Sequence, residues 1–203
     1  MKTAHLITKA AMISILATTS AIVSLVSTPA FAATSTVTAL SASEAKTLTY
    51  MREEEKVARD VYSNMYQLWR AAIFNNIASS EQQHMDTMKK MLDKYGLPDP
   101  ALPTVGTFSD PGLQSLYNTL LAAGSKSYID GLRVGATIEE VDMVDIQRAI
   151  DGTTHTDLKT AYQNLMEGSK NHLRAFVSTL QAQGVSYTPQ FISQELFDAI
   201  MSM

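Results

Sequence analysis

Two predicted helices carry acidic and histidine side chains on otherwise apolar faces. Residues 72–95 place an apolar side chain at every third or fourth position, and Glu81 and His84 are the polar members of that face. Side chains three positions apart on a helix project from adjacent turns in the same direction, so this pair can bind one metal ion. Glu55 interrupts a similar face in residues 41–69. A carboxylate buried in an apolar face is costly unless something pairs it, which favours a metal site.

Two later helices repeat the pattern. One carries Glu139 and Asp142 on its apolar face, and the next carries Ser169 and His172. Oxygen and nitrogen donors without sulfur suit iron or manganese, as one or two ions, with zinc as an alternative. If the four faces meet, the predicted metal ligands gather on one axis: Glu55, Glu81, His84, Glu139, Asp142 and His172.

The candidate ligands on the first and fourth long helices also have ordinary structural interpretations. Glu55 can pair with Arg59 on a helix surface, an interaction between positions four apart. The neighbouring Glu53 and Glu54 are expected to be solvated. His172 alone can be a hydrogen-bonded core histidine. The metal interpretation therefore depends on the coincidence that all four apolar faces are interrupted at one level.

The third long helix leaves further alternatives open. Asp142 and Asp145 can be surface charges, and Glu140 can take the place of Glu139 if the helix is rotated slightly. His155 lies at a helix start without an evident partner.

Hydrophobic periodicity predicts an all-α fold. A capping-box pattern at Ser41 and Glu44 marks the first helix start, and Gly96 is suited to end the second helix. The proline-rich segment 97–111 must form a long crossover, whereas the loops inside each helix pair are short. This pattern predicts a four-helix bundle with one crossover and short extra helices. The expected helices are residues 41–69, 72–95, 112–123, 126–150, 156–183 and 193–201.

Residues 1–32 have the pattern of a secretory signal peptide. Two lysines precede a long apolar run, and the run is followed by small residues at positions 30 and 32. A membrane anchor is the alternative, and the small-residue cleavage signal argues against it. We expect export to the periplasm or the extracellular space, with no stable membrane span after cleavage. Residues 33–40 then form a linker and residues 41–203 one domain.

The remaining chain has the size and charge of one acidic domain. Removing 32 of the 203 residues leaves 171, and losing two lysines takes the formal charge from −4 to −6. An acidic chain without a basic stripe is a poor nucleic-acid binder. The chain contains no cysteine, which excludes disulfides, thiolate nucleophiles and zinc–thiolate sites. A homodimer is compatible with the sequence, and no protein partner is indicated.

Short motifs resemble a known superfamily. Residues 55–62 are similar to the rubrerythrin pattern Glu-x-x-Ala-Arg-x-x-Tyr, and residues 77–84 resemble the Ile-Ala-x-x-Glu-x-x-His of the same group. Segments 53–62, 95–100 and 168–176 resemble a bacterial and archaeal ferritin-like family known as domain of unknown function 2202. The resemblance extends over nearly the whole domain. It implies a ferritin-like bundle that binds iron through the glutamate of the first motif.

One position departs from the di-iron pattern of that superfamily. Its members have a second Glu-x-x-His on the fourth helix, whereas here Ser169 stands at the glutamate position before His172. Asp142 can supply a replacement carboxylate from the third helix. We therefore expect a tight first ion and a labile second ion. Glu81 and Glu139 are expected to bridge, and the terminal ligands would be Glu55, His84 and His172.

Two classes of function follow. The first is an exported protein that binds iron or manganese and performs redox chemistry on O₂ or peroxide. Tyr62 and Tyr162 would donate hydrogen bonds to its ligands. The second is a non-enzymatic binding or envelope-structural module with a degenerate metal site. The sequence contains no nucleotide-binding loop or nucleophile triad, so it assigns no catalytic residue.

Overall fold

The protein is described by a computed structural model covering residues 38–202. All regular secondary structure in this range is helical, which confirms the all-α prediction. The predicted signal peptide and most of the predicted linker lie outside the described residues. No helix between residues 38 and 202 combines the length and apolar character needed to cross a bilayer. The helices are α1 (Ala42–Trp69), α2 (Ala72–Tyr95), α3 (Pro111–Gly124), α4 (Tyr128–Asp151), α5 (Thr156–Ala182) and α6 (Gln194–Met201).

The helix ends form where the sequence places its signals. Ser41 Oγ accepts a hydrogen bond from the Glu44 amide at 3.2 Å, and the Glu44 carboxylate accepts one from the Ser41 amide at 2.9 Å. This capping box satisfies donors that the first turn of α1 leaves free. Gly96 ends α2 with a φ of 67°, a left-handed conformation that glycine adopts at little cost.

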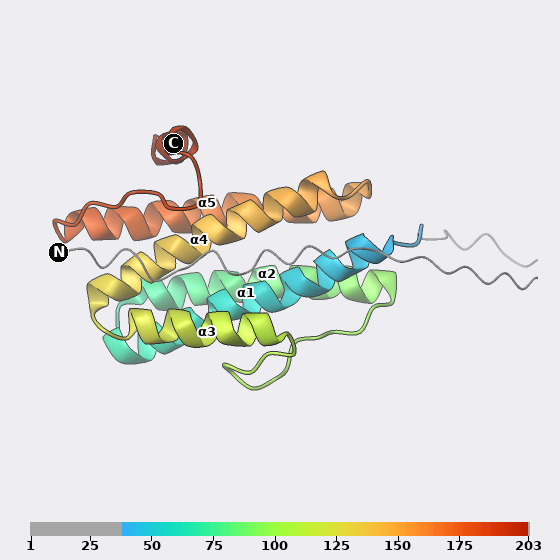
Figure 1. The fold of residues 1–203 in the computed structure, drawn as a ribbon, viewed down its shortest axis with the longest axis horizontal. Helices are drawn as coiled ribbons and strands as arrows, with labels where there is room; N and C mark the ends of the chain where they lie inside the picture. Colours follow the sequence, from blue (N-terminus) through green and yellow to red (C-terminus); the bar gives the residue numbers. More distant parts are fainter. Residues whose placement is uncertain (1–37, 203) are drawn as a thin grey trace, which may run out of the picture. The chain divides into compact units, whose positions relative to one another are not determined.

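The four long helices form two antiparallel hairpins (Figure 1). A short connection joins α1 to α2, and another joins α4 to α5. The hairpins pack together through α1 against α4 and α2 against α5, while α3 packs on α1 and α4. The long segment between α2 and α3 runs beside α1 to α3, and α3 then leads into the second hairpin at α4 (Figure 1).

A polar layer divides the core. On α1, Leu48 and Met51 belong to one apolar cluster, Val57 and Tyr62 belong to a second, and Glu55 lies between them. The other three long helices also pass from one cluster to the other, and each carries its buried polar residues near that change. All four apolar faces are therefore interrupted at a common level.

The crossover segment explains buried charge that the sequence did not predict. Lys56 Nζ binds Asp60 at 2.6 Å and donates to the backbone carbonyl of Thr104 at 3.0 Å. Glu53 accepts hydrogen bonds from the amides of Ser109 and Asp110. These contacts attach the crossover segment to α1 and exclude water from the charged side chains of Lys56, Asp60 and Glu53. The expectation that Glu53 is solvated was therefore wrong.

Candidate metal centre

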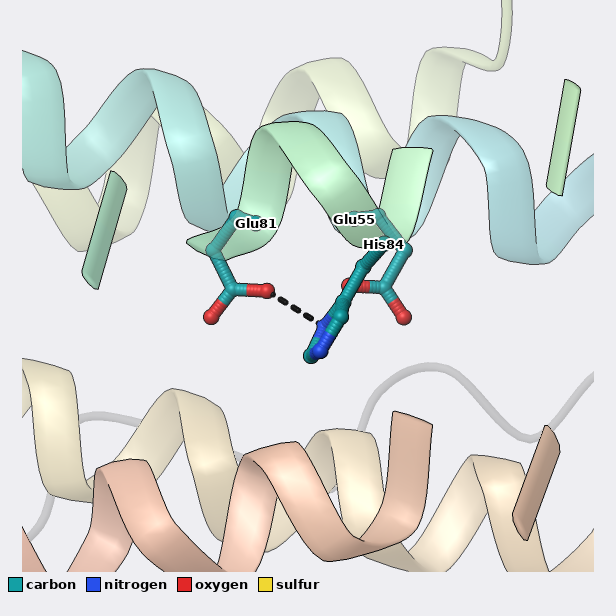
Figure 2. Close-up of side chains that lie close together, drawn as sticks. All are labelled: Glu55, Glu81 and His84. Atoms are coloured by element: carbon teal, nitrogen blue, oxygen red, sulfur yellow. Dashed lines mark hydrogen bonds and ion pairs between the residues drawn. The ribbon is translucent and has the colours of Figure 1, made fainter. Parts of the chain in front are cut away.

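Three predicted ligands from the first hairpin meet beside the second (Figure 2). Glu55 comes from α1, and Glu81 and His84 come from adjacent turns of α2. His84 Nδ1 lies 2.9 Å from Glu81 Oε2 and 3.2 Å from Glu55 Oε2. The three side chains point from α1 and α2 toward the α4–α5 hairpin. They form a compact group that could hold one metal ion.

A second group forms on the other side of Glu81. His172 Nδ1, from α5, lies 2.8 Å from Glu81 Oε1 and 3.4 Å from Glu139 Oε2 of α4. These three residues also place their ligand atoms close enough for one ion. Glu81 therefore belongs to both groups, with one oxygen directed to each histidine. Five of the six residues proposed from the sequence come together in this way.

Neighbouring residues orient the ligands. His172 Nε2 contacts Ser80 Oγ at 2.9 Å, so its Nδ1 faces the carboxylates. Tyr62, at the middle of α1, donates a short hydrogen bond to Glu139. The hydroxyl of Tyr162 is buried in the adjacent apolar cluster and has no hydrogen-bond partner among the described residues. Of the two tyrosines expected to support ligands, only Tyr62 reaches one.

Asp142 lies in the same layer but in neither group of three. One of its oxygens accepts a hydrogen bond from Ser169, and the other has no partner among the described residues. Its side chain is buried, so the surface-charge alternative for Asp142 was wrong. Ser169 is fully buried. It donates its hydrogen bond to Asp142, the residue expected to supply the carboxylate that position 169 lacks.

The site concentrates opposite charges away from water. Burial lowers the pKa values of His84 and His172, but the adjacent carboxylates outweigh it and raise them to about 11 and about 10. Burial raises the pKa of Glu55 to about 7. Burial also acts upward on Glu81, but hydrogen bonds and charge from both histidines bring its pKa to about 2. Without metal, imidazolium ions pair the carboxylates, and a bound cation would have to displace their protons.

Several alternative pairings do not occur. Arg59 binds Asp60 and Gln82 rather than Glu55, so the surface-pair interpretation of Glu55 was wrong. His155, for which the sequence showed no partner, contacts Glu44 at 2.9 Å.

Glu140 does not take the place of Glu139. It accepts hydrogen bonds from the Tyr187 hydroxyl and from the amides of Gln190, Phe191 and Ile192. Glu140 thereby fixes the segment that precedes α6.

Glu54 is a polar residue of the layer that the sequence analysis expected in solvent. It is buried, and neither of its oxygens has a hydrogen-bond partner among the described residues. Three consecutive side chains on a helix cannot share one face, so the helical pattern gave no signal that Glu54 is buried together with Glu55.

The donor set fits a divalent transition metal. Ligands at usual bond lengths around one ion lie roughly 3 Å apart, and the nitrogen–oxygen distances here are 2.8 to 3.4 Å. Glu55 Oε1 is buried without a partner among the described residues, which leaves it free to bind a cation. Carboxylate and imidazole donors in this proportion suit iron, manganese or zinc.

Together these features define an all-helical protein with a buried glutamate–histidine cluster. The chain belongs to the family described as "Uncharacterized protein domain (DUF2202)", which it matches over residues 44–203. It is 49% identical over 164 residues to the "Uncharacterized protein MJ0754" of Methanocaldococcus jannaschii, covering 80% of this chain and 89% of that protein. The crystal structure of hypothetical protein MJ0754 superposes with a TM-score of 0.80 at 46% identity, covering 89% of this chain and 98% of that one.

Proposed function

We propose that this protein is a ferritin-like four-helix bundle that binds iron or manganese between its two hairpins. The observation that carries the proposal is the position of Glu81, whose two oxygens face two different histidines from α2 and α5. A carboxylate placed in this way is suited to bridge two ions. Glu139 belongs to one of the groups alone, which makes it a weaker candidate for a second bridge.

The layer would serve redox chemistry because its side chains supply metal ligands and because it excludes bulk water. Iron or manganese bound there would supply one-electron chemistry toward O₂ or peroxide. The ligand side chains are almost fully buried, so the site excludes bulk water. Tyr62 would hold Glu139 in position through its hydroxyl group, and Ser80 would hold the His172 ring. We propose no catalytic residue beyond these.

Ser169 makes the two proposed metal positions unequal. The group of Glu55, Glu81 and His84 has all its side chains in place, whereas Asp142, the carboxylate expected to help hold the second ion, lies in neither group and accepts a hydrogen bond from Ser169. We therefore propose that the first ion binds tightly and the second binds weakly. If no metal binds, the same contacts form an ion-pair network, and the protein is a helical binding or structural module.

The test is a comparison of metal content. The chain is purified from cells grown with iron and manganese, and its metals are measured by elemental analysis. We expect one to two ions per chain in the natural protein and a loss of metal in Glu81→Gln. Glu167→Gln, an exposed change on α5, is the control and should keep its metal. Equal metal content in all three proteins would reject the metal site.

We also propose that the protein is exported, because residues 1–32 have the pattern of a signal peptide. The intact mass of the protein recovered from outside the cytoplasm should correspond to a chain that begins at Ala33. A retained Met1 would contradict cleavage and favour an N-terminal anchor.

A further inference from the structure

A cavity open to solvent lies between α4, α5 and the segment that leads into α6. Its volume is about 390 Å³, which is within the range of small-molecule sites. Met143 of α4, Met166 of α5 and Ile192 of the C-terminal segment each supply part of its apolar wall. None of the residues that line the cavity is a candidate metal ligand.

The wall contributed by the C-terminal segment is fixed by hydrogen bonds. Glu140 of α4 accepts hydrogen bonds from the amides of residues 190–192 at 2.6 to 3.1 Å. Arg174 of α5 donates to the backbone carbonyl of Ile200, in α6, at 3.2 Å. Ile192 is therefore held in place beside α4 and α5. A cavity with a fixed wall can bind a ligand without first ordering a segment, so less binding free energy is lost.

The polarity of the cavity changes from its inner end to its mouth. Met143 is 2% exposed, so it lies at the inner end. The side chains of Arg148 and Lys170 are 63% and 23% exposed, so they lie nearer the mouth. Among the described residues, no acidic side chain lines the cavity. An apolar interior with cations near its entrance suits a molecule that has an apolar chain and an anionic end.

Both cations have partners that a ligand can replace. Arg148 pairs with Asp145, and Lys170 pairs with Glu167 at 2.7 Å. Each pair joins positions three apart on one helix, and each has one strongly exposed member. Exposed pairs of this kind contribute little to stability. A carboxylate can therefore enter beside the two cations at little cost.

We propose that this cavity binds a fatty carboxylate, with its alkyl chain between α4 and α5 and its carboxylate beside Arg148 and Lys170. Methionines such as Met143 and Met166 are unbranched and flexible, so they adapt to an alkyl chain. Leu196 lines the same cavity and is 42% exposed, which leaves apolar surface that the chain would cover. The inference uses none of the candidate metal ligands, so it can fail separately from the proposed function.

Titration calorimetry tests the site with probes of known chain and charge. Metal-free protein is titrated with octanoate and with decanoate, each below the concentration at which it forms micelles. We expect a single molecule to bind each chain, and decanoate to bind about fifteenfold more tightly because it buries two more methylene groups. Decyltrimethylammonium has a similar chain with the opposite charge, and it should bind at least tenfold more weakly than decanoate.

Variants locate the binding. Replacing both cations, Arg148→Gln with Lys170→Gln, should weaken decanoate at least tenfold and should not weaken decyltrimethylammonium. Val144→Trp fills the cavity from a half-buried position on α4 and should abolish decanoate binding. Lys159→Gln removes an exposed cation from α5 outside the cavity and should change nothing. The variant without the two cations changes partly exposed side chains, so it should fold even if Val144→Trp does not.

Several results would reject the site. Decanoate binding that survives Val144→Trp would place the ligand elsewhere, and equal affinity for decanoate and decyltrimethylammonium would remove the role of the cations. Sedimentation showing a dimer that Val144→Trp dissociates would mean that a second copy covers the cavity. Failure of decanoate to bind would also reject the proposal. In Glu81→Gln, decanoate should bind as it does in the natural chain, so loss of the metal centre and loss of this site are distinguishable.

Discussion

At the residue scale, the orientation of His84 depends on a glycine. A Cβ atom at position 168 would lie 2.4 Å from His84 Nε2, closer than two such atoms can approach. The absence of a side chain at Gly168 lets the imidazole lie against α5 with Nδ1 directed to Glu55 and Glu81. Gly168 is thus a positioning residue for the ligand on the facing helix.

Gly168→Ala should weaken metal binding because the methyl group forces the His84 ring away from the carboxylates. We expect a loss of affinity of roughly ten- to a hundredfold, typical of changes to residues that orient a ligand. Metal titration measures it, and Ser178→Ala on the exposed side of α5 is the control. Unchanged affinity would show that the ring does not need this space to bind.

A substitution at Ser169 should strengthen metal binding, in contrast to the substitution at Gly168. Ser169→Glu introduces a larger and charged side chain into a fully buried position, so the metal-free protein should lose about 1–3 kcal/mol of stability. With Mn²⁺ present, the added carboxylate should tighten the weaker ion by about tenfold. Thermal unfolding and metal titration measure the two effects. A variant that loses stability and gains no affinity would show that Ser169 does not occupy a ligand position.

At the scale of elements, α2 and α5 are joined by a polar contact at the end of α2. Asp157 accepts hydrogen bonds from Lys94 at 2.7 Å and from the Tyr95 hydroxyl at 2.7 and 2.8 Å. Burial acts to raise the pKa of Asp157, but these donors outweigh it and lower the pKa to about 2. The contact therefore stabilises the fold while Asp157 is ionised.

Asp157→Asn should lower the free energy of unfolding at pH 7 by about 0.5–1 kcal/mol. The pKa is depressed in the folded state, so the contribution is complete above the unfolded value near 4 and is lost as the pH falls toward about 2. Urea unfolding of both proteins at pH 7, 4 and 2 should show the difference shrinking. Asp93→Asn, an exposed pair within α2, is the control. A difference independent of pH would contradict an ionic origin.

Glu140 connects α4 to the segment before α6. Glu140→Gln replaces a fully buried charged acceptor that receives three backbone amides, and should cost roughly 2–3 kcal/mol. Hydrogen exchange should accelerate at the amides of residues 190–192 more than in the centres of α1 and α2. Uniform loss of protection would instead indicate global destabilisation.

At the scale of the whole molecule, the polar layer separates two apolar clusters that would otherwise form a continuous core. The layer is held by charge pairing rather than by apolar packing. A ligand that binds only the folded protein stabilises it by an amount set by its concentration. Metal should therefore control the stability of the fold.

Metal at a hundred times its dissociation constant should add about 2.7 kcal/mol to the free energy of unfolding. For a domain of this length that corresponds to a rise of about 5–10 °C in the melting temperature. Calorimetry with Mn²⁺ and with a chelator measures the difference, and Glu81→Gln should show none. Equal melting temperatures in the natural protein would argue for the non-enzymatic module.

The sequence alone determined the helices and five of the residues that meet in the layer. Helical periodicity is local, so the spacing of Glu81 and His84 shows that they share a face whatever packs on it. Apolar neighbours on the same face indicate that this face is buried, and the observed α1 and α2 bounds agree with those expected.

Only the tertiary structure decided which other charges are buried and what they bind. Glu53, Glu54 and Glu140 lie within two positions of predicted ligands, yet Glu53 holds the crossover, Glu140 holds the segment before α6, and Glu54 is buried without a hydrogen-bond partner among the described residues. These partners are distant in sequence, and no helical pattern encodes them. Burial of a charge depends on what covers it, so it is decided by contacts between elements rather than within one.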